Sequence, residues 1–272
     1  MPGVLSLVTP RPHFTIPLPD GRSLHLGPRT LVMAIVNVTP DSFADGADIL
    51  DIGGESTRPG AAPLSIDDEL ARVEPVLEGL RGRVAVPLSI DTYKAAVAER
   101  AIDLGASIVN DISALVYEPA LAEVVARRGA AVVLMHNRGR SSEMYAEARY
   151  GDVVADVRQE LAARVAAAER AGISRDRIIV DPGLGFAKKA EHTLRALAGL
   201  PGLAELGLPI LSGPSRKSFM KPALGDCPPA ERVWGTAAAV AASVLLGAHI
   251  VRVHDVREMV QVVRVADAIA TA

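Results

Sequence analysis

Charged and amide side chains recur in this chain directly after short apolar runs. Asp91, Asn110 and Asp181 each stand at or near the end of such a run. Two carboxylates and a carboxamide offer the acceptors and donors that suit a flat heterocycle rich in N–H groups. Other polar residues end further runs of this kind, and the full set is Asn37, the loop of residues 53–60, Asp91, Asn110, Asp111, His136, Asp181, Ser215, Arg216, Lys217, Arg252, His254 and Asp255.

Several members of this set carry positive charge. Arg58, Arg252 and His254 could hold phosphate, and the guanidinium of Arg252 could also stack on a ring. Lys217 adds a mobile point charge. Each residue alone also fits a structural role, because asparagines cap turns, aspartates cap helices and His136 could be a buried imidazole. Together, carboxylates, amides and cations aimed at one opening predict a polar ligand site.

The elements that position these residues alternate between strand and helix. Apolar strand-like runs cover residues 31–38, 48–53, 86–91, 107–111, 131–136, 178–181, 209–213 and 250–254. Segments with helical periodicity cover residues 66–80, 93–104, 119–128, 152–171, 191–200, 231–246 and 256–270. Eight buried strands that alternate with helices predict an α/β fold, the (β/α)8 TIM barrel.

A doubly wound open sheet is the structural alternative. The barrel is favoured because polar residues stand at nearly every strand end and no Gly-rich dinucleotide fingerprint follows the first strand. Residues 14–18 and 23–26 flank a turn signal at residues 19–22 and predict a β-hairpin that covers one barrel end. We expect one domain over residues 1–272, with the hairpin extension in residues 1–28.

One step of the barrel pattern is too short. Only about nine residues separate Val38 from Asp48, whereas a parallel crossover generally needs a dozen or more and usually contains a helix. The first barrel helix therefore has no sequence to form it. Either the chain has lost that element, or this sequence omits a stretch that the parent protein contains. Its loss should expose one side of two strands.

Composition excludes several functional classes. Hydrophobic residues make up 49% and aromatic residues 3% of the chain, so the core must be aliphatic. A net charge of -3 gives no continuous basic face for nucleic acid. The longest apolar stretch, residues 236–248, is too short for a bilayer span and the start shows no signal peptide, so we expect a cytoplasmic protein without a membrane partner. Cys227 alone permits no internal disulfide, and no catalytic triad, zinc-protease or P-loop motif occurs.

Two long segments resemble the paired signature of dihydropteroate synthases. They are residues 37–43, Asn-Val-Thr-Pro-Asp-Ser-Phe, and residues 51–60, Asp-Ile-Gly-Gly-Glu-Ser-Thr-Arg-Pro-Gly. The resemblance continues in order through residues 89–92, 109–112, 135–136, 181–186, 215–218 and 252–256, so it covers nearly the whole chain. It implies a pterin-binding barrel that joins 6-hydroxymethyl-7,8-dihydropterin diphosphate to p-aminobenzoate in folate biosynthesis.

The same resemblance implies a role for each matching residue. The residues that would hold the pterin ring are Asp91, Asn110, Asp181 and Lys217, with Arg252 stacked on its face. Those that would grip or close over the diphosphate are Arg252, His254, Thr57 and Arg58. Those that would shape the p-aminobenzoate pocket, where sulfonamide drugs would compete, are Pro59, Phe186, Lys217 and Ser218. The reaction itself would depend on Asp91, Lys217, Arg252 and His254.

The resemblance also implies a cofactor and a partner subunit. Asn37 would bind Mg²⁺ that the diphosphate carries, and the apolar helix at residues 236–246 could form a homodimer interface, although packing on the barrel is an equal alternative. Metal and cations would stabilise the departing diphosphate, and the aniline nitrogen would then attack, so no protein nucleophile is needed.

Departures from the family pattern keep other functions open. The loop after Phe43 is short, Ala187 stands where Gly is usual, and residues 137–139 differ. The alternatives are a non-catalytic pterin-binding paralogue and a pterin-dependent methyltransferase. The intact pterin set predicts pterin binding in the first case, so turnover would separate it from a synthase.

Overall fold

The computed structural model describes residues 8–36, 46–56, 60, 62–140, 145 and 148–272. Eight parallel strands form its central sheet, in the order β8-β7-β6-β5-β4-β3-β10-β9. Their bounds are β3 Leu31–Val36, β4 Ile49–Gly53, β5 Leu88–Asp91, β6 Ala106–Asp111, β7 Ala131–Met135, β8 Ile178–Asp181, β9 Leu211–Ser212 and β10 Ile250–Val253. A bridge between Val180 and Ile210 joins the two ends of this order. The sheet therefore closes on itself, and the predicted TIM barrel is confirmed.

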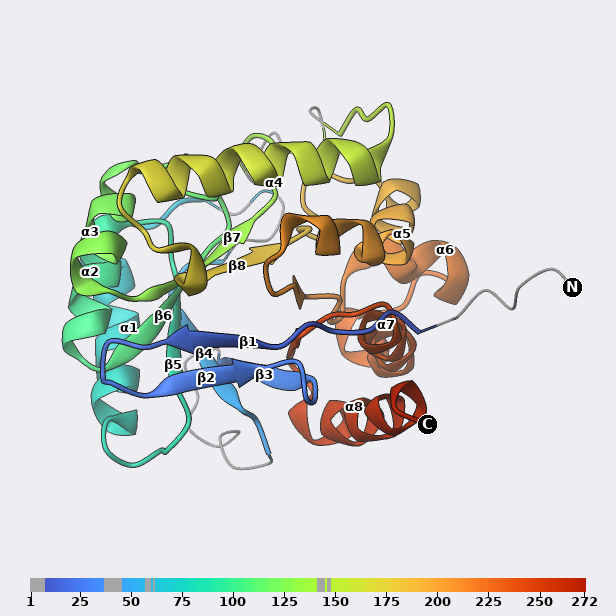
Figure 1. Ribbon diagram of the computed structural model, residues 1–272, viewed down its shortest axis with the longest axis horizontal. Helices are drawn as coiled ribbons and strands as arrows, with labels where there is room; N and C mark the ends of the chain where they lie inside the picture. Colours follow the sequence, from blue (N-terminus) through green and yellow to red (C-terminus); the bar gives the residue numbers. More distant parts are fainter. Residues whose placement is uncertain (1–7, 37–45, 57–59, 61, 141–144, 146–147) are drawn as a thin grey trace, which may run out of the picture.

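Helices surround the barrel on its outer side. Their bounds are α1 Ile66–Leu80, α2 Ala95–Asp103, α3 Ala120–Arg128, α4 Val153–Arg170, α5 Ala190–Ala198, α6 Lys221–Leu224, α7 Val233–Leu245 and α8 Val256–Ala270. Short 3-10 helices occupy Arg175–Arg177, Leu200–Leu206, Ser218–Met220 and Pro229–Glu231. Figure 1 shows α1, α2 and α3 along one side and α7 beside α8 near the C-terminus. None of the helices in the described residues is long and apolar enough to cross a membrane.

Local sequence explains where individual helices begin and end. The Ser65 hydroxyl accepts a hydrogen bond from the Asp68 amide at 3.1 Å, which caps the start of α1. Gly129 ends α3 in the left-handed conformation, with φ of 63°. The two sequence-based predictions for α1 and α8, residues 66–80 and 256–270, match the observed bounds.

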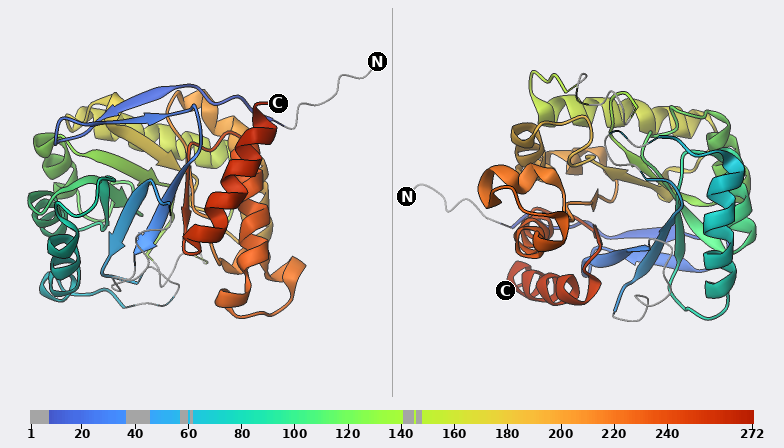
Figure 2. Two further views of the ribbon diagram at one scale, coloured as in Figure 1. Left: turned by 90° about the horizontal axis from the view of Figure 1, so that it is seen from below. Right: turned by 180° about the vertical axis from the view of Figure 1, so that it is seen from behind.

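An N-terminal hairpin closes one end of the barrel. Strands β1, Phe14–Pro17, and β2, Ser23–Leu26, pair antiparallel, as predicted. Their side chains pack on apolar residues inside the barrel, including Leu31, Ile49 and Ile250, which begin their strands. Figure 2 shows the hairpin lying across this end. Polar chemistry is thereby left to the opposite end, where the strands finish.

The short first crossover has a different consequence from the one expected. Strands β3 and β4 pair in parallel register, Met33 with Ile49 through Val36 with Ile52. Residues 37–45 lie outside the described part of the chain, and the described residues of this connection, Gly46 to Asp48, contain no helix.

The prediction that one side of these strands is exposed is wrong. Val32, Ala34, Leu50 and Ile52 are all buried. Helix α8 lies against β3 and α1 lies against β4, so the neighbouring helices cover the outer face. Asp48 stabilises the end of the connection, since its carboxylate accepts from the Val32 amide and pairs with Arg29.

Candidate active site

Strand register brings the first polar residues together at the carboxyl end of the barrel. Gly53 of β4 is the register partner of Asp91 in β5, and Asp91 is the partner of Asn110 in β6. The carboxylate and the carboxamide therefore stand on neighbouring strands at the same height. This arrangement follows from the parallel topology, because strand ends that share a height face one opening.

Arg252 of β10 reaches across the opening to two carboxylates. Its Nε donates to Oδ2 of Asp51 at 2.6 Å, and its Nη2 donates to Oδ2 of Asp91 at 2.6 Å. The Asn110 amide donates to the same Asp51 oxygen at 3.0 Å. The other Asp51 oxygen is buried and has no hydrogen-bond partner among the described residues. Two carboxylates thus share one guanidinium, which leaves an excess of acceptors.

Burial and the neighbouring charges both shift the pKa values of Asp91 and Arg252. Burial raises the pKa of Asp91 to about 7; Arg252 opposes that rise, and the Asp51 carboxylate adds to it. Burial would lower the pKa of Arg252, but the carboxylates of Asp51 and Asp91 outweigh it and raise the pKa. The guanidinium accordingly stays protonated, and Asp91 can change its charge near neutral pH.

A second polar group stands beside the first, on the loop after β8 and the loop after β9. One Asp181 oxygen accepts from the Gly183 amide at 2.7 Å. The Lys217 ammonium donates to the Leu184 carbonyl at 2.6 Å and lies 4.6 Å from the centre of the Phe186 ring. The Phe186 ring, the Lys217 ammonium and the Asp181 carboxylate therefore lie close together on one side of the opening.

Burial acts on the two charged members of this second group in opposite senses. It raises the pKa of Asp181, and Lys217 opposes that rise. It lowers the pKa of Lys217 to about 8, against the charge of Asp181. Each group favours the charged form of the other, but burial is the larger effect on both pKa values, and such perturbed values cluster at functional sites.

The loop after β10 adds an imidazole and an ion pair. The Ser215 hydroxyl contacts Nδ1 of His254 at 3.0 Å and accepts from the His254 amide at 3.1 Å. Arg216 pairs with Asp255 through an Nε donor at 2.9 Å, which ties the two loops together. Ser218 is exposed beside them.

Two residues at strand ends have structural roles. The Asp111 carboxylate is occupied by the backbone amides of Ser113 and Leu115, at 2.7 and 2.5 Å, so it caps the turn after β6. His136 is buried, and its ring contacts Lys188 and Glu160. The structural reading that the sequence left open therefore applies to these two residues.

Four predicted site residues cannot be placed. Asn37, Thr57, Arg58 and Pro59 lie outside the described residues. The start of the loop that carries three of them is nevertheless anchored. Glu55 accepts hydrogen bonds from Lys94 at 2.6 Å, from the Tyr93 hydroxyl at 3.0 Å and from the Leu64 amide at 2.9 Å.

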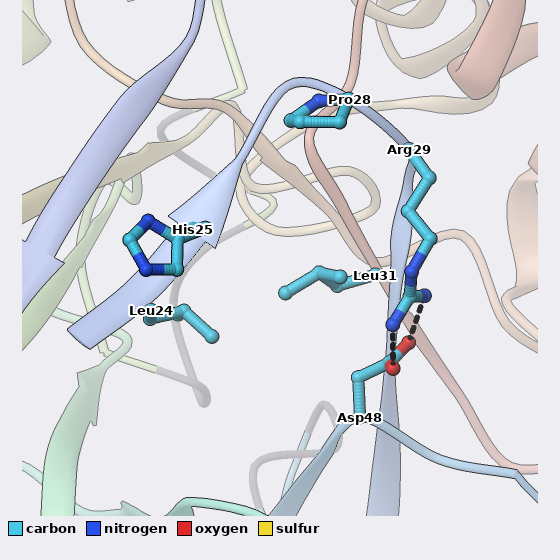
Figure 3. A pocket seen from close by; sticks show the side chains of 6 residues that line it. All are labelled: Leu24, His25, Pro28, Arg29, Leu31 and Asp48. Atoms are coloured by element: carbon cyan, nitrogen blue, oxygen red, sulfur yellow. Dashed lines mark hydrogen bonds and ion pairs between the residues drawn. The ribbon is translucent and has the colours of Figure 1, made fainter. Parts of the chain in front are cut away.

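A pocket also lies at the opposite end of the barrel, beneath the hairpin. Figure 3 shows its lining residues, which are Leu24, His25, Pro28, Arg29, Leu31 and Asp48. They belong to β2 and to the beginnings of β3 and β4. Its charged side chains, Arg29 and Asp48, are already paired with each other. The polar cluster at the carboxyl ends, rather than this pocket, is the candidate active site.

Comparison with known proteins identifies the family. The model of a family described as pterin binding enzyme matches residues 43–254. A dihydropteroate synthase of Synechocystis is 45% identical over 278 residues, which cover 94% of this chain and 96% of the relative. The chain belongs to the dihydropteroate synthase family. The predicted enzyme class is thus confirmed over the non-catalytic paralogue, and the methyltransferase alternative is set aside.

Solved structures of dihydropteroate synthases share the fold closely. That of Xanthomonas albilineans with 4-aminobenzoic acid has a TM-score of 0.87 and 41% identity, covering 96% of this chain and 100% of that chain. That of Burkholderia cenocepacia with 7,8-dihydropteroate has a TM-score of 0.87 and 42% identity, covering 95% and 97%. The 278-residue alignment with the Synechocystis enzyme is longer than this 272-residue chain, so that relative has residues that this chain lacks.

Sequence reasoning assigned no role to two buried charged residues beside the candidate site. In the sequence, Asp51 stands inside the apolar run that forms β4, so the pattern counts it with that run. In the structure its side chain is fully buried and accepts hydrogen bonds from Arg252 and Asn110. Lys188 is buried behind the loop after β8. The signal for Asp51 was a lone carboxylate inside an otherwise apolar strand, which must be paired when buried.

Proposed function

We propose that this chain condenses 6-hydroxymethyl-7,8-dihydropterin diphosphate with p-aminobenzoate to give 7,8-dihydropteroate and diphosphate, a transfer of a pterinylmethyl group in folate biosynthesis. The observation that carries the proposal is the arrangement of Arg252 between Asp51 and Asp91, with Asp181 at the end of β8 and Lys217 on the loop after β9. The two solved relatives are described with 4-aminobenzoic acid and with 7,8-dihydropteroate, the second substrate and the product of this reaction.

The pterin ring would bind to the carboxylates and the amide. Asp91 and Asp181 would accept from ring N–H groups, and Asn110 would complete the polar edge. Lys217 would donate to a ring acceptor, and Arg252 would stack on the ring face. Asp51 supports this role because it holds Nε of Arg252, which fixes the plane of the guanidinium.

The p-aminobenzoate would bind on the other side of Lys217. The Phe186 ring already lies against the Lys217 ammonium. Ser218, the residue after Lys217, is exposed. Pro59 would complete the pocket, and Thr57 and Arg58 would close over the substrates. Sulfonamides would compete for this position.

The reaction requires that the departing diphosphate be stabilised and that the amine, rather than water, reach the pterin carbon. Arg252 and His254 would neutralise the diphosphate as the pterin C–O bond breaks, and the positive charge would spread into the ring. The aniline nitrogen then forms the new C–N bond and loses a proton. No protein nucleophile takes part, which agrees with a site built from carboxylates, cations and amides.

Magnesium would enter with the diphosphate. When bound, Mg²⁺ would supply charge neutralisation to the leaving group. Asn37, which directly follows β3, offers the carboxamide oxygen that such a cation accepts. No cluster of three His, Cys, Asp or Glu residues in the described residues could hold a metal ion. Asn37 and the diphosphate oxygens would hold the ion, with water completing its coordination.

The proposed enzyme is a cytoplasmic homodimer. Each subunit is a single pterin-binding domain, residues 1–272, with the hairpin extension in residues 1–28. Trp234 of α7 is 80% exposed, and Val265 and Ile269 of α8 are 62% and 57% exposed. Such side chains on two adjoining helices favour an interface between copies of the chain. Sedimentation analysis of the protein and of Trp234→Glu tests this, since a monomeric wild-type protein would contradict it.

Steady-state kinetics with each substrate varied in turn test the site. Asp181→Ala should reduce kcat/KM for the pterin diphosphate by roughly 100-fold, because a buried charge-assisted acceptor is lost. Phe186→Ala should chiefly raise KM for p-aminobenzoate. Equal effects of both variants on both substrates would contradict the division of the site into a pterin side and a p-aminobenzoate side.

A further inference from the structure

Lys188 is a lysine whose side chain is almost entirely buried, with 2% of its surface exposed. Its ammonium contacts Nδ1 of His136 at 2.8 Å, the Gly183 carbonyl at 3.1 Å and the Phe186 carbonyl at 3.1 Å. An ammonium group has three N–H donors, and three acceptors surround it here. Every donor of the protonated side chain is therefore used within the protein, while burial lowers the pKa of Lys188 to about 7 against the opposing charge of Asp181.

Two of the three acceptors belong to one turn of the active-site loop. Gly183 and Phe186 are its first and last residues, and the Phe186 amide also donates to the Gly183 carbonyl at 3.0 Å. Gly183 has φ of 65°, and a Cβ there would lie 1.9 Å from the His136 carbonyl oxygen. The turn thus packs directly on the end of β7, and Lys188 joins both of its ends to that strand.

The third acceptor, His136, is itself held in place. Its Nε2 contacts Glu160 at 3.0 Å, and Glu160 also pairs with Arg138. Burial lowers the pKa of His136 to about 4, against the opposing hydrogen bond that His136 donates to Glu160. The ring is therefore neutral at physiological pH, with its proton on Nε2 facing Glu160 and its Nδ1 free to accept from Lys188.

The braced turn carries the groups proposed to receive p-aminobenzoate. Between its ends, the Leu184 carbonyl accepts from Lys217 at 2.6 Å, and the Phe186 ring lies 4.6 Å from the same ammonium. A shift of the turn would move both the ring and the acceptor that orients Lys217. Asp91 and Asn110 stand at the ends of β5 and β6, away from this turn, whereas Asp181 ends β8 and accepts from the Gly183 amide at 2.7 Å.

We infer that Lys188 is a positioning residue for the p-aminobenzoate side of the site. By holding the two ends of the turn 183–186 against His136, it fixes where Phe186 and Lys217 stand. The inference rests on the proposed function, which assigns Phe186 to p-aminobenzoate and places Lys217 between the two substrates. A merely structural lysine would affect stability and both substrates alike, whereas a positioning lysine affects one substrate more than the other.

The test compares Lys188→Met with Lys189→Met in the full-length protein. Lys189 is exposed, and its side chain makes no capping hydrogen bond at the start of α5. Lys188→Met should raise KM for p-aminobenzoate roughly 10-fold or more, as expected for loss of hydrogen bonds from a charged donor, and should raise KM for the pterin diphosphate by a smaller factor, since Asp91 and Asn110 also hold that substrate. Lys189→Met should behave as the wild-type protein.

Hydrogen exchange of the Gly183 and Phe186 amides gives a readout independent of turnover. Exchange should become several-fold faster in Lys188→Met and stay unchanged in Lys189→Met. If the wild-type protein makes no product but the turn still loosens, the proposed function fails and the positioning role of Lys188 stands. Unchanged exchange, or equal changes in both KM values, overturns the positioning role.

A milder variant keeps the test decisive if Lys188→Met does not fold. Lys188→Gln retains two N–H donors, so it should give the same selective rise in KM to a smaller degree. Tyr150→Phe removes the hydroxyl that donates to the Ala187 carbonyl at 2.9 Å, a second tie on this loop. Folded Lys188→Gln with wild-type kinetics for both substrates and wild-type exchange would also overturn the inference.

Discussion

The Nη2 atom of Arg252 donates to Oδ2 of Asp91 across the mouth of the barrel, at 2.6 Å. These residues lie 161 positions apart in the sequence. Their contact joins the strand β10 to the strand β5, and Asp51 holds Nε of the same guanidinium from β4. The two residues proposed to contact the pterin from its edge and from its face are thereby coupled to each other.

Replacing Arg252 by lysine should disable the site although the positive charge remains. A lysine ammonium has no planar fork, so it cannot hold Asp51 and Asp91 in the same geometry or stack on a ring. We expect kcat/KM for the pterin diphosphate to fall by roughly 100-fold, as for loss of one partner of a desolvated charge pair. Stopped-time product assays on Arg252→Lys measure this, and activity within a few-fold of wild type would contradict it.

Pterin affinity should depend on pH through Asp91. The pKa of this carboxyl is raised to about 7, so it is ionised above that pH and protonated below it. Only the ionised form accepts from two N–H donors, so affinity should fall as pH decreases through about 7. Calorimetric titration over this range should show the step in wild type. A step of equal size in Asp91→Asn would assign the pH dependence to another group.

His136 should remain neutral to low pH and contribute to acid sensitivity. Its pKa is lowered from 6.5 to about 4, mainly by burial. The unfolded chain therefore binds this proton at higher pH than the folded chain, so stability is lost as pH falls from about 6.5 towards 4, by up to about 3 kcal/mol. Nitrogen NMR of the imidazole should detect a proton on Nε2 at neutral pH. A protonated ring at pH 6 would refute this.

Removing a buried charge beneath the loop after β4 should lower the free energy of unfolding substantially. Lys94 pairs with Glu55 at 2.6 Å and with Glu69, of which 1% is exposed. Lys94→Met leaves both carboxylates without their cation and should lower the free energy of unfolding by about 3–5 kcal/mol. Denaturant unfolding measures this change. Arg100→Met, which removes an exposed pair with Glu74, serves as control and should leave the free energy of unfolding nearly unchanged.

The barrel could be predicted because its pattern is local and repeated. Each strand is a short apolar run, each helix shows its own periodicity, and the polar residue at each strand end is fixed by topology alone. Strand β9 is shorter than the predicted residues 209–213: Pro209 has no N–H to continue the ladder, and Ile210 forms only an isolated bridge to Val180. The covering of β3 by α8 could not be predicted, because it depends on how two elements more than 200 residues apart settle against each other.

The sequence predicted which residues stand at the candidate site better than it predicted their hydrogen-bond partners. Asp91, Asn110 and Asp181 stand at strand ends, so the rule of parallel strands locates them. The contacts of Lys188 involve His136, 52 residues away, and a turn whose shape is set by glycines in the left-handed region. Sequence spacing carries no information on which buried acceptors a lysine meets.

The most direct test of the synthase assignment is product formation by the purified chain. The protein is incubated with the pterin diphosphate, radiolabelled p-aminobenzoate and Mg²⁺, and its intact mass is compared with that of this sequence. We predict labelled 7,8-dihydropteroate, formed despite the short connection between β3 and β4, and formation roughly 100-fold slower with Asp181→Ala at low pterin concentration. A protein of the correct mass that binds the pterin and forms no product would contradict the account.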